Sequence, residues 1–207
     1  MNRVKEFMKK SPTLKIYRSV FDGANMANRL LRTDSLTRPP VKIPFVVDNL
    51  WEWGRPEKYP SRRLSAFASP QIQLAKKQGP PNGEVYRIEF PGRFRICQLK
   101  EYQDAAHHPE CISLSVALFE KLGNGWLKSS MQSKDEAGRL WLPVLKKDEV
   151  DSLFEQVRIL REYREELRAS IHFWEDVELI DPEHPHINEE NELFFEAPDG
   201  YYLRPVS

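Results

Sequence analysis

The fold of this protein is decided by residues 64–90, LSAFASPQIQLAKKQGPPNGEVYRIEF. Residues 63–68, RLSAFA, alternate so that one side carries only apolar side chains, which predicts a short strand. Ser69 and Pro70 then favour a helix start, because serine caps exposed backbone N–H groups and proline suits the first helical position. GPPNG ends that helix and leads into EVYRIEF, which alternates like a second strand. The stretch therefore predicts a strand, a helix and a strand in succession.

Further strands are expected on both sides of this unit. LKIYRSV, residues 14–20, and FRICQL, residues 94–99, have the composition of short strands, and a weakly helical stretch is expected at residues 24–32. ELFFE and GYYLRPV form two final strands around an APDG turn. Ser113 to Leu122 reads as a short helix closed by Gly123.

Two longer segments complete the chain. Residues 148–169 predict one long helix with an apolar face and a face dense in Glu and Arg, which is most simply solvated but would also suit a protein partner. Residues 38–63, rich in Pro, Trp and Arg, predict a largely irregular loop. Short strands and helices without regular alternation indicate a mixed α+β fold, and 207 residues indicate a single domain over 1–207.

Composition narrows the classes of function. Lys and Arg total 31 and Asp and Glu total 31, so the zero net charge argues against permanent residence on DNA or on an anionic membrane. Two cysteines, Cys97 and Cys111, are too few for a disulfide framework. Residues 1–14 lack the apolar run of a secretory signal, and no window is long and apolar enough to cross a membrane. We expect a cytoplasmic protein, delivered by other machinery if it acts in a target cell.

Three separated motifs carry side chains suited to chemistry. Arg18 lies in IYRS, Ser65 and Ser69 lie in SAFAS, and Glu190 and Glu192 lie in EENE just before an apolar strand. An arginine is a planar, permanently charged fork for phosphate, and a carboxylate beside a sugar stabilises positive charge that develops there.

In order, spacing and strand context, these motifs resemble those of the ADP-ribosyltransferase superfamily, in its Arg, Ser, Glu-x-Glu branch. The resemblance spans residues 14–206 and implies a split mixed or antiparallel β-sandwich with flanking helices around an NAD cleft. It implies NAD as co-substrate rather than bound cofactor, and a macromolecular acceptor, more often protein than nucleic acid. Small bacterial or phage members are toxins or effectors, which suggests a neutralising protein as a further partner. The family's serine-threonine-serine is replaced here by SAFAS.

The same resemblance implies roles for the motif residues. Arg18 would bind the NAD phosphates, and either Ser65 or Ser69 would brace the ribose on the nicotinamide side. Glu192 would be the catalytic carboxylate, and Glu190 would position the acceptor.

Each assignment has a simpler alternative that the sequence leaves open. Arg18 also suits a strand arginine paired with a carboxylate, and Glu192 suits an exposed, solvated acid. The stretch NLWEWGRPEKYPSRR, residues 49–63, either clamps a nucleotide with aromatic rings and arginines or anchors a loop through Trp51 and Trp53. The histidine pairs at 107–108 and 184–186 lack the partners of a metal site, so no metal is expected.

Three functions remain open on the sequence. The first is ADP-ribosyl transfer from NAD to a macromolecule. The second is NAD hydrolysis, in which water is the acceptor. The third is a binding module on the same fold without catalysis, or an unrelated α+β interaction protein in which the motifs are coincidental. Glu192 turned away from any pocket, or Arg18 packed far from it, would favour this third function.

Overall fold

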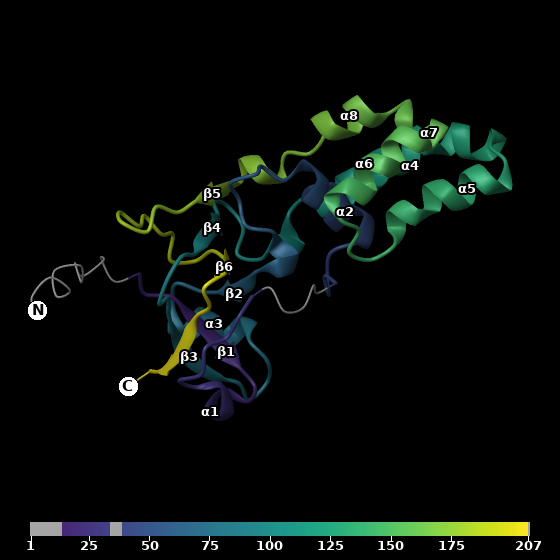
Figure 1. Ribbon diagram of the computed structural model, residues 1–207. Coiled ribbons are helices and arrows are strands. Elements are labelled where there is room, and N and C mark those ends of the chain that lie inside the picture. Colours follow the sequence, from purple (N-terminus) through teal and green to yellow (C-terminus); the bar gives the residue numbers. More distant parts are fainter. Residues whose placement is uncertain (1–13, 34–38, 207) are drawn as a thin grey trace, which may run out of the picture.

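The structure is a computed structural model that describes residues 14–33 and 39–206, so the N-terminal segment 1–13 and Arg38 lie outside the described residues. The protein has an α+β fold, as predicted. Two small sheets occupy one end of the molecule and most helices the other (Figure 1). Within the described ranges, no helix combines the length and the apolar character needed to cross a membrane.

All strand pairs in the two sheets are antiparallel. The three-stranded sheet has the order β1 (Tyr17–Val20), β3 (Glu84–Glu89), β7 (Tyr202–Pro205). The four-stranded sheet has the order β2 (Ala66–Ala68), β6 (Leu193–Glu196), β4 (Arg95–Leu99), β5 (Val177–Leu179). A bridge joins β1 to the end of β2, in which Tyr17 and Ser69 exchange two backbone hydrogen bonds of 2.8 Å. The two sheets therefore meet next to Arg18.

The α-helices are α1 (Gly23–Met26), α2 (Phe45–Gly54), α3 (Ile72–Gln78), α4 (Glu110–Lys128), α5 (Met131–Gly138), α6 (Lys147–Gln156), α7 (Arg158–Arg161) and α8 (Arg164–Ala169). Four 3-10 turns accompany them: η1 (Arg62–Leu64), η2 (Ala105–His107), η3 (Arg139–Trp141) and η4 (Phe173–Glu175). The strand, helix and strand predicted at residues 64–90 are present as β2, α3 and β3.

Strand β6 forms a wall between two hydrophobic cores. Phe194 belongs to the core of the helical end, whereas Leu193 and Phe195 belong to the core between the sheets. This division follows from the alternation of side chains along a strand. All three side chains are fully buried. Hence β6 is fixed from both faces by the two cores, and Glu192, which directly precedes β6, is placed by the same strand.

The predicted long helix at 148–169 is wrong. It is divided into α6, α7 and α8, because Val157 is extended, with φ −86° and ψ 109°, and the chain leaves helical geometry again at Tyr163. The apolar residues of α6, α7 and α8 still pack in one core. The helical period of apolar residues therefore continues across the breaks, and for that reason the sequence pattern did not reveal them. Tertiary packing overrides local propensity here.

Two other helix predictions need correction. The segment 38–63 is not irregular throughout, because α2 runs through it and buries Trp51 and Trp53. The helix expected at Ser113–Leu122 runs from Glu110 to Lys128, and Gly123 does not end it. Glycine in a helix costs only about 1 kcal/mol relative to alanine, which packing of the buried stripe of α4 offsets.

The turn after β6 is fixed by two features. Asp199 accepts hydrogen bonds from the backbone N–H and the Nε of Arg93, at 2.8 and 3.0 Å, and its other oxygen accepts from Nη2 at 3.0 Å. Gly200 adopts φ +88°, and a Cβ there would lie 2.6 Å from Leu30 Cδ1 and 2.8 Å from the Leu31 oxygen. Only glycine fits this turn without strain.

Candidate functional site

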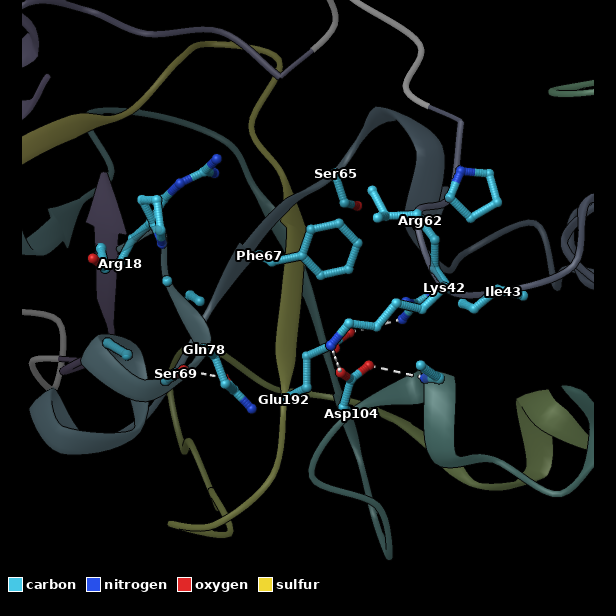
Figure 2. Close-up of a pocket in the computed structure, with 18 of the residues that line it drawn as sticks. Arg18, Lys42, Ile43, Arg62, Ser65, Phe67, Ser69, Gln78, Asp104 and Glu192 are labelled. Atoms are coloured by element: carbon cyan, nitrogen blue, oxygen red, sulfur yellow. Dashed lines mark hydrogen bonds and ion pairs between the residues drawn. The ribbon is translucent and has the colours of Figure 1, made fainter. Parts of the chain in front are cut away.

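A cavity of about 420 Å³ lies where the two sheets meet the helical end, and it holds most of the predicted site residues. Arg18, Ser65, Ser69 and Glu192 all line it. These residues come from three segments far apart in the chain. In Figure 2, Phe67 stands between Arg18 on one side and the group around Glu192 on the other. The volume falls in the range of small-molecule sites, roughly 300–1,000 Å³.

Arg18 reaches the cavity from the middle of β1. Its backbone pairs with Tyr86 in β3, and its neighbour Tyr17 makes the bridge to Ser69. The side chain is half-buried. Arg18 is therefore held at the seam between the sheets, opposite the wall that carries Glu192.

Ser69 is buried and does not cap a helix, so the predicted capping role is wrong. Helix α3 begins at Ile72, and its N-cap residue, Gln71, makes no side-chain capping bond. The Ser69 hydroxyl instead donates to Gln78 Oε1 at 2.7 Å, and Gln78 Nε2 donates to the Gln103 carbonyl oxygen at 2.8 Å. Ser69 and Gln78 together link β1, the end of β2 and α3 beside the cavity.

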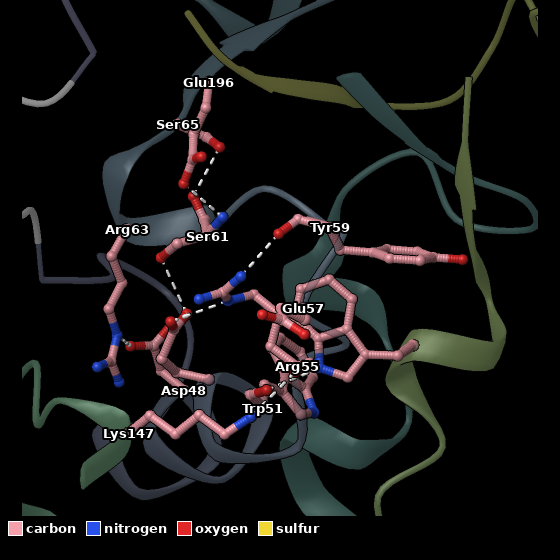
Figure 3. A network of polar contacts seen from close by, with 12 residues as sticks. Asp48, Trp51, Arg55, Glu57, Tyr59, Ser61, Arg63, Ser65, Lys147 and Glu196 are labelled. Carbon is pink, nitrogen blue, oxygen red and sulfur yellow. Dashed lines mark hydrogen bonds and ion pairs between the residues drawn. The ribbon is translucent and has the colours of Figure 1, made fainter. Parts of the chain in front are cut away.

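Ser65 lies at the opposite end of β2, on the side of Arg62 (Figure 2). Its hydroxyl donates to the Ser61 carbonyl oxygen at 2.6 Å. Ser61 is itself anchored, because its N–H donates to Glu196 at 2.7 Å and its hydroxyl donates to Glu52 at 2.9 Å (Figure 3). This network fixes the turn that precedes β2. Both candidate serines line the cavity, so the geometry leaves their assignment open.

Glu192 immediately precedes β6 and is buried, which makes the alternative of an exposed, solvated acid wrong. Its Oε1 lies 2.9 Å from Arg62 Nη1 in an ion pair. Burial raises the pKa of the Glu192 carboxyl, and the charge and hydrogen bond of Arg62 oppose that rise, as does a hydrogen bond from the Ala105 N–H. Asp104 adds negative charge nearby and raises the same pKa.

Glu190 lies outside this group. It is exposed, it is not among the residues that line the cavity, and its N–H donates to Asn188 Oδ1 at 3.0 Å. Residues 189 and 190 form a turn, so the alternation of β6 does not extend back to them. Glu189 accepts a hydrogen bond of 2.9 Å from Gln71. The structure thus separates the two acids of the Glu-x-Glu motif.

In the stretch 49–63, the two tryptophans anchor the chain in the core, whereas one arginine belongs to the candidate site. Trp51 and Trp53 are buried in the helical core, where they stack on Phe173 and Phe154 at 3.9 and 4.5 Å between ring centres. The loop-anchoring alternative therefore describes both tryptophans. Arg62, which the sequence offered only as one of several nucleotide clamps, is the residue that contacts Glu192.

Arg63 is buried beside the cavity and ties three segments together. Its Nε donates to Asp48 at 2.6 Å, its Nη2 donates to Asn49 Oδ1 at 2.6 Å, and its Nη1 donates to the Leu145 carbonyl oxygen (Figure 3 shows the bond to Asp48). The turn η1 thus directs two consecutive arginines differently, one to Glu192 and one to α2. A sequence of two adjacent arginines carries no sign of this division.

The remaining charged contact at the cavity is weaker. Lys42 Nζ lies 3.7 Å from Asp104 Oδ2, and the lysine side chain is 71% exposed (Figure 2). An exposed pair at this distance contributes about 0–1 kcal/mol.

In the described ranges, no group of three or more His, Cys, Asp or Glu side chains is placed to hold a metal ion. His108, from one of the histidine pairs, instead contacts Asp176 at 3.0 Å.

No protein-family model, no curated protein and no solved structure matches this chain. Its function is therefore inferred from the cavity and the residues that line it.

Proposed function

We propose that this protein cleaves NAD in the cavity and transfers ADP-ribose to a macromolecular acceptor. One observation carries the proposal: Arg18, Ser65, Ser69 and Glu192, taken from three motifs up to 174 positions apart, line a single cavity. Accidental motif matches on unrelated surface strands would not be expected to converge in this way.

The two walls supply complementary chemistry. Arg18 on β1 offers a guanidinium to the diphosphate of NAD. Phe67 is 36% exposed and turns away from its buried neighbours Ala66 and Ala68, so its ring offers a flat apolar surface for a heterocycle. Glu192 on the opposite wall offers a carboxylate to the ribose.

The reaction that these groups would support breaks the bond between C1′ of the ribose and the nicotinamide nitrogen. Nicotinamide leaves with the electron pair of that bond and becomes neutral. The positive charge left on the ribose would be stabilised by the carboxylate of Glu192, which is itself buried. The acceptor then adds its lone pair to C1′ and loses its proton to water.

A second candidate, NAD hydrolysis with water as the acceptor, is favoured by the position of Glu190. That residue was expected to orient a macromolecular acceptor, but it lies outside the cavity. Transfer and hydrolysis share the first bond cleavage and differ only in the nucleophile. An inactive binding module would share the cavity without either reaction.

The test is incubation of the purified protein with NAD labelled in its adenylate part, with and without a cell lysate, while released nicotinamide is measured. Glu192→Gln should reduce nicotinamide release at least about 100-fold, the usual loss when one electrostatic group of a reaction site is removed. Glu190→Gln is the matched control, because it makes the same change outside the cavity and should leave cleavage intact.

Label in the protein or nucleic-acid fraction that disappears with Glu192→Gln would establish transfer and its acceptor class. Nicotinamide release without label on any macromolecule would support hydrolysis instead. Intact NAD in every sample, or equal loss with both variants, would refute the proposal.

A further inference from the structure

Arg62 has an unusual environment for a charged side chain. It is 8% exposed, and its guanidinium carbon lies 5.0 Å from the ring centre of Phe67, 5.1 Å from that of Phe194 and 5.5 Å from that of Phe173. These rings belong to β2, β6 and η4. Three elements therefore enclose one cation, and one of the three rings, that of Phe67, also lines the cavity.

Such a cation is stable only with a compensating charge, because removing an ion from water costs several kcal/mol unless it is paired and hydrogen-bonded. Each cation–π contact with an aromatic ring offsets part of this cost, by about 0.5–2 kcal/mol. Among the described residues, the carboxylate bonded to Arg62 is that of Glu192 at 2.9 Å, and Arg62 Nε has no hydrogen-bond partner. The arrangement directs the arginine toward Glu192.

The same contact acts on the charge of Glu192, whose pKa burial raises. The groups that face its carboxyl are Arg62 from η1, the Ala105 N–H from η2 and the carboxylate of Asp104 just before η2, whose own partner is Lys42. Burial and Asp104 favour the protonated acid, whereas Arg62 and the Ala105 N–H favour the carboxylate. Among the residues that the structure describes, Arg62 is the positive charge in direct contact with Glu192.

We propose that Arg62 is a positioning residue of this site, which holds the Glu192 side chain at the cavity wall as a carboxylate at neutral pH. Contact with NAD is left to Arg18, Phe67 and Glu192, and Arg62 acts through Glu192. The inference rests on the proposed function for its catalytic consequence. The ion pair itself can be tested without NAD.

The first measurement is the titration of Glu192 by carbon NMR of protein labelled at glutamate carboxyls, with Glu192→Gln identifying its signal. Glu192 of the wild-type protein should be ionised at pH 7. In Arg62→Met, which keeps the length and removes the charge, its titration should move upward by more than one pH unit. In Arg62→Lys, which keeps the charge, the move should be smaller.

The second measurement is the pH dependence of nicotinamide release. Losing the positive charge raises the pKa of Glu192, so the acid limb of kcat/KM should move to higher pH in Arg62→Met, and activity should partly recover as the pH is raised. Arg62→Lys should restore most of the rate at pH 7. Arg168→Met is the matched control, since Arg168 lies 5.3 Å over the ring of Trp53, outside the residues that line the cavity.

A wild-type Glu192 that is protonated at pH 7 overturns the inference, and this result needs no variant to fold. An unchanged titration in Arg62→Met overturns it as well, as does an equal pH-independent loss of rate in both Arg62 variants. A shifted titration in a protein that leaves NAD intact would retain the control of Glu192 by Arg62 and refute the proposed reaction instead.

Discussion

Replacing Arg63 by methionine should be among the most destabilising single substitutions at the cavity. The side chains of Arg63 and Asp48 are 5% and 6% exposed, and their atoms approach to 2.6 Å. Removing the arginine leaves a buried carboxylate without its charged partner, a change that costs about 3–5 kcal/mol. Asn49 Oδ1 loses one of its donors in the same change, and the Leu145 carbonyl oxygen also loses a donor. Since native proteins are stable by roughly 5–15 kcal/mol, the variant should approach the limit of folding.

Urea unfolding followed by tryptophan fluorescence measures this effect, because the five tryptophans include Trp51 and Trp53 in the adjoining core. Arg63→Lys should lose less, about 1–3 kcal/mol, since it keeps the charge but not the forked donors. Adding Asp48→Asn to Arg63→Met should recover part of the loss, because a buried amide costs less than a buried carboxylate. A loss below about 1 kcal/mol for Arg63→Met, or no recovery in the double variant, would show that the pair does not hold α2 to the cavity wall.

Two further predictions concern the turn after β6, and urea unfolding also tests them. Gly200→Ala should cost at least about 1–2 kcal/mol, because a left-handed backbone and the close approach of Leu30 both oppose a Cβ. Gly138→Ala, where a Cβ meets no atom within 4 Å in helical backbone, should be neutral or slightly stabilising, and equal losses at the two glycines would refute the argument. Asp199→Asn should lower stability at pH 6, because the hydrogen bonds from Arg93 lower the pKa of Asp199 from 3.8 to about 2. That contribution exists above pH 4 and is lost as the pH falls through 2, so the difference from wild type should shrink over this range, and a constant difference would contradict it.

The sequence predicts the strands better than the helices, for a physical reason. Alternation and turn residues are local signals, and they located β1, β2, β3, β4, β6 and β7 within a few residues, whereas β5 was not predicted. The breaks at Val157 and Tyr163 are invisible locally, because the apolar period continues across them. Helix α2 was missed because prolines and glycine flank it, and its stability comes from burying its tryptophans.

The candidate site was predictable where motif residues lie on a strand or directly beside one. Arg18, Ser65, Ser69 and Glu192 were named from sequence and line one cavity, whereas Glu190 lies outside it. The contact of Arg62 with Glu192 joins residues 130 positions apart and has no local signature. Arg62 and Arg63 contact different partners because both lie in the 3-10 turn η1, which was not predicted from the sequence.

The position of β6 in the four-stranded sheet has a consequence for biosynthesis. It lies between β2 and β4, and β7 completes the other sheet beside β3. Both sheets are therefore completed by residues 193–205, more than 90 positions after the strands with which these residues pair. A nascent chain whose residues 193–205 are still inside the ribosome lacks β6, the strand that places Glu192 at the wall of the cavity. Such a chain has no complete site, and the cavity closes only once β6 and β7 are free to pair.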